Sequence, residues 1–157
     1  MKTSVFSTSL TALGLRDAIS TAASAGFDAI EVGCFSPHLT LDVAEERTGE
    51  VHGWLEAADL AVSALSLSTG YTDERDAAWQ RSVDETLRYL RLCGRFGATV
   101  LKTMPGTPSS REATERQWGR FRRAMEVIVP VARKEGALIV IENHLGHLSD
   151  SIETSER

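Results

Sequence analysis

The chain has 157 residues, with 17 Lys and Arg against 22 Asp and Glu, so its net charge is −5 and its length predicts one domain. Its 42% hydrophobic and 25% charged residues are typical of a globular protein, which excludes disorder, collagen-like repeats and a disulfide scaffold. The acidic balance also argues against nucleic acid as a partner, because phosphate backbones are bound by clustered Lys and Arg.

Short β-rich runs alternate along the chain with longer stretches of helical period. Ser4 to Ser7 predicts a first strand, and Leu15, Ala18, Ile19 and Ala22 then mark the buried face of a helix. Gly26 is expected to end that helix in the left-handed conformation. The further predicted elements are strands over 27–32, 61–67, 99–102 and 138–142 and helices over 42–58, 77–96 and 111–135, the last two closed by Gly97 and Gly136.

This alternation is typical of βαβ units, so the fold class is α/β with a parallel sheet covered by helices. No linker or low-complexity tract divides the sequence, which predicts a single domain over residues 1–157. The final residues, 149–157, combine Ser and Asp with acidic side chains, as the start of a further helix does.

The two cysteines, Cys34 and Cys93, are expected to be reduced thiols. The first residues lack the sustained apolar stretch of a signal peptide, and no run approaches the roughly 18 apolar residues of a membrane-spanning helix. We therefore expect a cytoplasmic protein without a membrane partner.

Ligands of parallel α/β sheets bind at the carboxyl ends of the strands, and two carboxylates are expected there. Glu142 closes the apolar fifth strand, where a carboxylate serves as a metal ligand, as a general base or as an ion-pair partner for a residue such as Lys102. Glu31 ends the second strand as either a functional or a buried, paired carboxylate. Lys102 ends the fourth strand and either binds an anionic or hydroxylated substrate or pairs with Glu142 or Glu31.

Imidazoles lie near the same strand ends. His144 and His147 are three residues apart, a spacing that brings two ring nitrogens to one divalent ion if the segment makes a helical turn. Each of the two is alternatively a substrate contact. His38 follows a proline in the loop after the second strand and is a weaker substrate-binding candidate.

Three segments carry a family likeness: Ala25 to Val32, Lys102 to Gly106, and Ile139 to His144. They resemble the xylose isomerase-like TIM barrel superfamily, which contains sugar phosphate isomerases and epimerases and AP endonuclease family 2. The resemblance implies a (β/α)8 TIM-barrel type of fold, of which the sequence holds the first five strands and four helices. We therefore expect a partial barrel that is C-terminally truncated.

The resemblance also implies a chemistry. Members of the family that isomerise sugars use a divalent ion to move a proton between adjacent carbons of a hydroxy-carbonyl substrate. By position, Glu142 resembles the first metal ligand and catalytic carboxylate, and Glu31 and His144 resemble substrate-side residues. The implied cofactor is Mn, Mg, Co or Zn, and the implied ligand is a sugar or a sugar phosphate.

Two departures from the family pattern limit these expectations. The DNA-repair branch has a zinc-binding His before the Pro-Gly of the fourth strand, where this chain has Met104, so an AP endonuclease-like hydrolase is disfavoured. Ligands from the sixth to eighth strands have no counterparts in the sequence. The chain is therefore expected to be incomplete for catalysis alone, or to complete itself as a homo-oligomer.

Two further readings compete with an isomerase. The first is a non-catalytic module that binds a sugar or a partner without metal chemistry. The second is a flavodoxin-like flavin carrier, since the hydroxyl-rich segment 7–11 could hold a phosphate at the N-terminus of the following helix.

Overall fold

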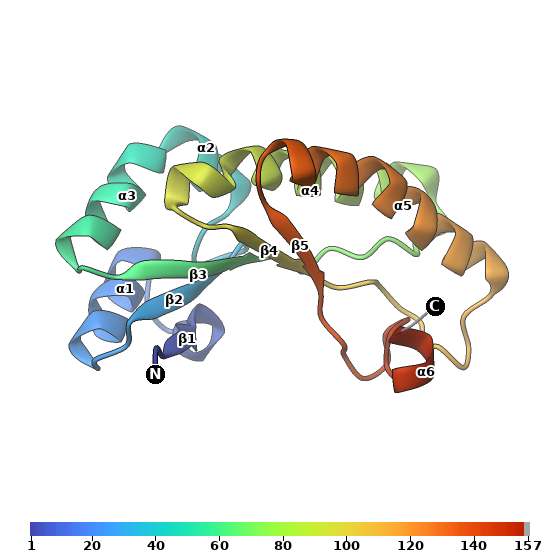
Figure 1. Ribbon diagram of the computed structural model, residues 1–157, viewed down its shortest axis with the longest axis horizontal. Helices are drawn as coiled ribbons and strands as arrows, with labels where there is room; N and C mark the ends of the chain where they lie inside the picture. Colours follow the sequence, from blue (N-terminus) through green and yellow to red (C-terminus); the bar gives the residue numbers. More distant parts are fainter. Residues whose placement is uncertain (156–157) are drawn as a thin grey trace.

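The computed structural model describes residues 1–155 and contains one parallel sheet in the order β1-β2-β3-β4-β5 (Figure 1). Each strand pairs with the next strand in the sequence, and a helical segment connects each pair. The strands are β1 Ser4–Phe6, β2 Ala29–Gly33, β3 Ala61–Ser66, β4 Val100–Thr103 and β5 Leu138–Ile141.

The helices follow the predicted alternation. A short 3-10 helix, η1, follows β1, and a second, η2, extends the end of α4. The segments are η1 Ser7–Leu10, α1 Leu15–Ser24, α2 Leu41–Glu46, α3 Thr48–Ala57, α4 Asp76–Cys93, η2 Gly94–Phe96, α5 Glu115–Lys134 and α6 Ile152–Ser155. Among residues 1–155, no helix combines the length and the apolar character needed to cross a membrane.

The core lies between the helices and one face of the sheet. Side chains of a strand alternate between its two faces, and Ile30, Val32 and Leu101 are buried. The intervening residues Glu31 and Lys102 are only partly buried, so they lie on the other face of the sheet. The sheet therefore has an apolar face covered by helices and a second face that carries charged groups.

Several local predictions are confirmed. Leu15, Ala18, Ile19 and Ala22 are the buried residues of α1. Gly26 has a φ of 83°, which a residue with a Cβ rarely adopts, and it ends the turn between α1 and β2. Cys34 and Cys93 are buried free thiols, and burial raises the pKa of each.

The predicted helix over 42–58 is wrong in its continuity, because α2 and α3 are separate helices. Arg47 lies between them with φ −118° and ψ 22°, outside the helical region. Thr48 and Gly49 follow at once, and both residue types have low helix propensity. The apolar periodicity of this stretch therefore spans two short helices.

The fifth strand is also less covered than its apolar sequence predicts. Leu138 is 61% exposed, and Ile139, Val140 and Ile141 are only partly buried. β5 lies at the edge of the sheet and pairs only with β4. An apolar parallel strand is normally covered on both faces, so β5 offers apolar surface that this chain leaves exposed.

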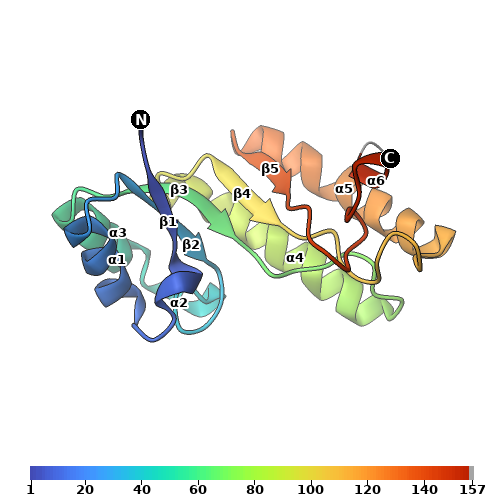
Figure 2. The same ribbon diagram turned by 90° about the horizontal axis from the view of Figure 1, so that it is seen from below.

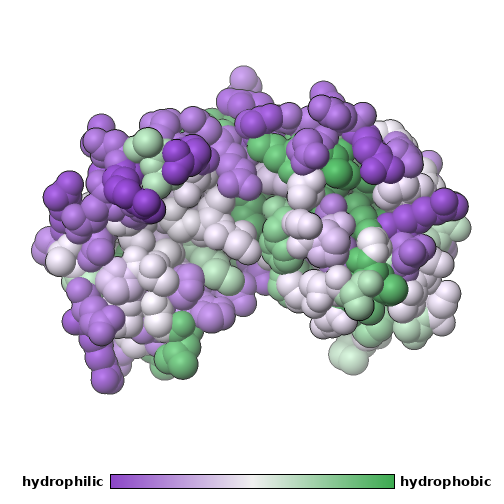
Figure 3. Space-filling view, turned by 180° about the vertical axis from the view of Figure 1, so that it is seen from behind, coloured by the Kyte–Doolittle hydropathy of each residue, from purple (hydrophilic) through white to green (hydrophobic). Residues whose placement is uncertain are grey.

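The strand order decides between the two candidate α/β architectures. A flavodoxin-like sheet has the order 2-1-3-4-5, whereas this sheet runs in sequence order, so the flavodoxin prediction is wrong. The five strands fan out with a steady twist (Figure 2), and the molecule forms an arch that is hollowed on one side (Figure 3). This is the geometry of a partial (β/α)8 barrel.

Candidate functional site

Three charged side chains meet near the carboxyl ends of β2, β4 and β5, and we call Glu31, Lys102 and Glu142 the carboxyl-end cluster. Lys102 Nζ lies 2.6 Å from Glu31 Oε1 and 2.8 Å from Glu142 Oε2. The strand order places Lys102 between the two carboxylates, because β4 lies between β2, which carries Glu31, and β5, which Glu142 follows. Glu142 N donates to Thr103 O at 2.8 Å. One ammonium therefore serves two carboxylates.

Lys102 is held by more than charge. Its side chain is 17% exposed, and Nζ lies 4.4 Å from the ring centroid of Phe6, at the end of β1. Burial alone lowers the pKa of Lys102, but the contacts with Glu142 and Glu31 outweigh this effect and leave the pKa raised. Lys102 is thus a protonated, partly buried cation at the centre of the cluster.

The two carboxylates pair with Lys102 in the same way but differ in exposure. Each forms an ion pair with Nζ, and both contacts raise the pKa of Lys102. The Glu31 side chain is 23% exposed and its Oε1 is buried, whereas the Glu142 side chain is 34% exposed. Glu142 is therefore the more accessible carboxylate of the cluster.

His144 and His147 form a second group, after β5. His147 N donates to His144 O at 3.0 Å, but Gly146 has a φ of 79°, so the turn is not the helical turn that the paired metal site required. The two ring centroids are 4.9 Å apart in an edge-on arrangement. His144 is exposed and its Nδ1 donates to Leu145 O at 3.0 Å, while His147 Nδ1 is buried without a partner among the described residues.

The pKa of His147 is lowered, first by burial and then by the neighbouring His144. A group whose pKa is lower in the folded than in the unfolded chain contributes stability above its unfolded pKa and loses it as the pH falls through the folded pKa. We therefore expect the free energy of unfolding to decrease as the pH falls from about 7.5 to about 5.5, across the ordinary histidine range. Urea unfolding of wild type and His147→Gln measures it; equal pH slopes in both would contradict the prediction, and His52→Gln is the exposed control.

His38 lies away from solvent, with 2% of its surface exposed. Its Nδ1 is 3.0 Å from Ser7 Oγ, which also accepts a hydrogen bond from Gly33 N at 2.9 Å. If the Ser7 hydroxyl donates to Nδ1, the ring hydrogen of His38 is on Nε2, which is buried without a partner among the described residues. His38 thus connects the loops after β1 and β2, and its substrate-binding role stays a prediction.

Sequence reasoning missed two partners of the predicted residues. Phe6 packs on Lys102, and Ser7 orients His38. The order of the strands could have indicated the second contact, since Ser7 and His38 follow the neighbouring parallel strands β1 and β2 and so lie at one end of the sheet. The first contact is harder to predict, because β2 and β3 lie between the strands of Phe6 and Lys102.

The donor types in this region suit a divalent ion, but their number is small. Carboxylate oxygens and imidazole nitrogens are ligands for Mn, Mg, Co or Zn. Residues 1–155 contain no group of three or more His, Cys, Asp or Glu side chains placed to hold one ion. The carboxyl-end cluster therefore contains carboxylate oxygens but, within residues 1–155, forms no complete metal site.

A family model for the xylose isomerase-like TIM barrel matches residues 19–157. The chain belongs to this family. No curated protein matches the sequence significantly. The family assignment agrees with the strand order and with the partial barrel.

Solved structures show the same fold at low identity. A D-tagatose 3-epimerase-like protein is 16% identical, with a TM-score of 0.82 over 99% of this chain and 58% of that one. The IOLI protein with a bound zinc atom is 15% identical, with a TM-score of 0.80 over 99% of this chain and 56% of that one. The probable 3-DHS dehydratase AsbF from Bacillus anthracis is 16% identical, with a TM-score of 0.78 over 99% and 57%. This chain spans a little over half the length of each neighbour.

Proposed function

We propose that the chain is part of a sugar isomerase or epimerase, in which the carboxyl-end cluster binds a sugar or sugar phosphate and moves a proton between adjacent carbons. The observation that carries the proposal is the convergence of Glu31 and Glu142 on Lys102 at the edge of the sheet where ligands bind. Membership of the family and an epimerase-like structural neighbour support the same reaction class.

The cluster suits a hydroxy-carbonyl substrate. The Lys102 ammonium can donate to a carbonyl oxygen, on which negative charge develops when the neighbouring carbon loses its proton. The Glu31 and Glu142 carboxylates can accept hydrogen bonds from sugar hydroxyls, and a carboxylate released from Lys102 can accept the proton from carbon. Phe6 and the partly buried position of Lys102 keep bulk water from one side of this cation.

A divalent ion is part of the proposal. Such an ion, when bound, polarises the carbonyl and hydroxyl oxygens of the substrate. We propose Glu142 as one of its ligands, with Glu31, His144 and Lys102 on the substrate side. The other ligands would come from outside residues 1–155, either from further residues of the same protein or from a second copy.

The test measures metal and proton transfer separately. Wild type and Glu142→Gln are titrated with Mn²⁺ by calorimetry and their size is followed by gel filtration, with Glu126→Gln on the exposed face of α5 as the matched control. Exchange of a carbon-bound proton of candidate ketoses in D₂O is followed by NMR. We expect Glu142→Gln to weaken Mn²⁺ binding at least ~10-fold and to abolish exchange, since it removes a ligand charge, while Glu126→Gln changes neither.

A second candidate function is a sugar-binding module without catalysis. The observation that favours it is the ion pairing of both carboxylates with Lys102, which leaves neither as a free base. Sugar binding that is unchanged by Glu142→Gln and by removal of divalent ions would support this module. A chain that binds no divalent ion in any oligomeric state contradicts metal-assisted catalysis by this chain or by its homo-oligomer.

A further inference from the structure

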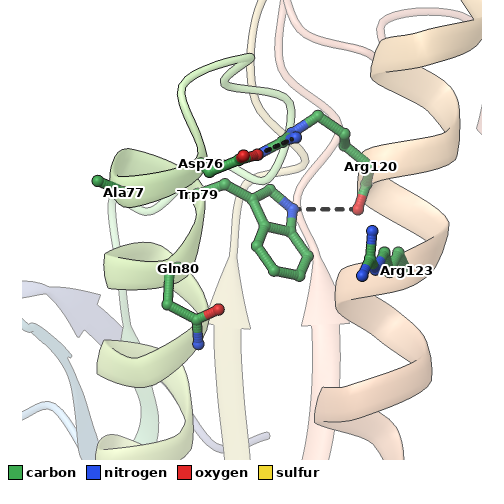
Figure 4. A pocket seen from close by; sticks show the side chains of 6 residues that line it. All are labelled: Asp76, Ala77, Trp79, Gln80, Arg120 and Arg123. Atoms are coloured by element: carbon green, nitrogen blue, oxygen red, sulfur yellow. Dashed lines mark hydrogen bonds and ion pairs between the residues drawn. The ribbon is translucent and has the colours of Figure 1, made fainter.

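A cleft of about 400 Å³ lies between the first turns of α4 and the middle of α5, and it shares no residue with the carboxyl-end cluster (Figure 4). α4 and α5 belong to the helical layer, whereas the cluster lies on the other face of the sheet. The cleft has the size of a small-ligand site. Its lining residues are Asp76, Ala77, Trp79, Gln80, Arg120 and Arg123.

Arg120 is the centre of this cleft and is fixed on several sides. Its Nη1 donates to Asp76 Oδ1 at 2.8 Å, and its backbone oxygen accepts a hydrogen bond from Trp79 Nε1 at 3.2 Å. The guanidinium carbon lies 5.3 Å from the Trp79 ring centroid. Figure 4 shows the guanidinium reaching past the indole towards Asp76. The side chain is 15% exposed, so its position is defined by packing as well as by charge.

One edge of the Arg120 guanidinium is unused. Nε and Nη2 are both buried and have no hydrogen-bond acceptor among the described residues. Buried charged donors without a partner are costly, and they are the exception in folded proteins. The Nε and Nη2 donors form the edge that holds a carboxylate with two parallel hydrogen bonds.

Other arginines of the same chain show what this edge accepts. Three of them hold a carboxylate with both Nε and Nη2. The pairs are Arg47 with Glu50, Arg75 with Asp73 and Arg88 with Glu45. Arg120 uses only Nη1 for its own partner, Asp76, so the edge that the other three fill stays open.

A second cation lies beside Arg120. The guanidinium carbon of Arg123 is 5.9 Å from the centroid of the same Trp79 ring. The pKa of Asp76 is lowered, first by its hydrogen bond with Arg120 and also by the charges of Arg116 and Arg123. Positive charge therefore prevails in the cleft despite the single carboxylate of Asp76, whose side chain is 94% exposed.

We propose that the cleft between α4 and α5 binds a small organic dicarboxylate. One carboxylate lies side-on against Nε and Nη2 of Arg120, and the second lies near the guanidinium of Arg123. The Trp79 ring contacts both guanidinium groups, and Asp76 holds Arg120 in position. Because Nε and Nη2 are buried, binding requires a side-chain movement that opens this edge to the cleft, which Arg120 lines. The site stands apart from the proposed sugar chemistry and does not depend on it.

The experiment titrates the chain with malonate and follows the Nε–H signal of Arg120 by ¹⁵N NMR. We expect a saturable shift of this signal in wild type. Arg120→Lys keeps the charge but removes the paired Nε and Nη2 donors, so it should weaken malonate binding at least ~10-fold. Arg123→Gln should reduce malonate affinity to that of acetate. Arg122→Lys is the matched control, because Arg122 is exposed and pairs with Glu115 at 3.8 Å outside the cleft.

Three results of this experiment would overturn the proposal or its choice of ligand. Absence of a saturable shift in wild type overturns the proposal, and this measurement needs no folded variant. Equal malonate affinities of Arg120→Lys and Arg122→Lys also overturn it. Inorganic phosphate that binds as tightly as malonate overturns the assignment of a carboxylate. Loss of Mn²⁺ binding or proton exchange in Glu142→Gln leaves malonate binding unchanged, so this proposal and the proposed function fail independently.

Discussion

Lys102→Met should lower the free energy of unfolding by about 1–2 kcal/mol. This loss is smaller than that from breaking a fully buried ion pair, because the three side chains are partly exposed. The variant removes the ammonium that separates Glu31 from Glu142, and the two carboxylates are then left without a counter-charge. Urea unfolding at neutral pH measures the loss.

Two controls make this result specific to the cluster. Lys134→Met, at the exposed end of α5, should change stability by less than about 0.5 kcal/mol. The triple variant Glu31→Gln, Lys102→Met, Glu142→Gln removes all three charges together and should recover most of the stability, because neutral side chains do not repel. A triple variant less stable than Lys102→Met would show that packing, and not charge, determines the role of Lys102.

Gly106→Ala should destabilise the chain by about 2–3 kcal/mol. Gly106 follows β4 with a φ of 109°, which side chains rarely adopt. A Cβ at this position would collide with Thr72 Oγ1 and lie 3.0 Å from the backbone nitrogen of Tyr71. Gly106 O also accepts a hydrogen bond from Leu148 N at 2.9 Å, so the strain would spread to the segment after β5.

The matched control for Gly106→Ala is expected to change the stability in the opposite direction. Gly119 lies within α5, and a Cβ there would meet nothing within 4 Å. Gly119→Ala should therefore stabilise the chain by about 0.5–1 kcal/mol, since alanine loses less backbone freedom in a helix. Thermal unfolding of both variants measures the two shifts. A tolerated Gly106→Ala would mean that the loops after β3 and β4 adapt together without strain.

The fold could be predicted from the sequence where the pattern involves residues close together in the chain. The α1 face of Leu15, Ala18, Ile19 and Ala22 needs only helical periodicity, and Gly26 needs only a turn of known geometry. The single helix predicted over 42–58 failed because periodicity carries across Arg47, where the backbone leaves the helical region. Apolar periodicity shows which side chains face the core, but it does not show where the backbone of a single residue interrupts a helix.

The proximity of the charged residues at the strand ends could be predicted, but many of the side-chain contacts around them could not. Glu31, Lys102 and Glu142 were identified because each ends a strand, and the ion-pair alternative for Lys102 is confirmed with both carboxylates. The buried hydrogen bonds of Tyr71 with Thr86 and Thr103 join a loop, a helix and a strand, and no short motif encodes them. The pairing of Trp79 with Arg120 spans 41 residues and depends on how α4 packs against α5.

The sequential strand order also has a consequence for the folding pathway. Every strand pairs with the strand immediately before or after it in the chain, so each hydrogen-bonded ladder closes a loop of only one βα unit. Loop closure of this kind costs less chain entropy than pairing segments that are several βα units apart. Each βα unit can therefore add to the sheet next to the unit that precedes it in the chain, without waiting for a distant segment.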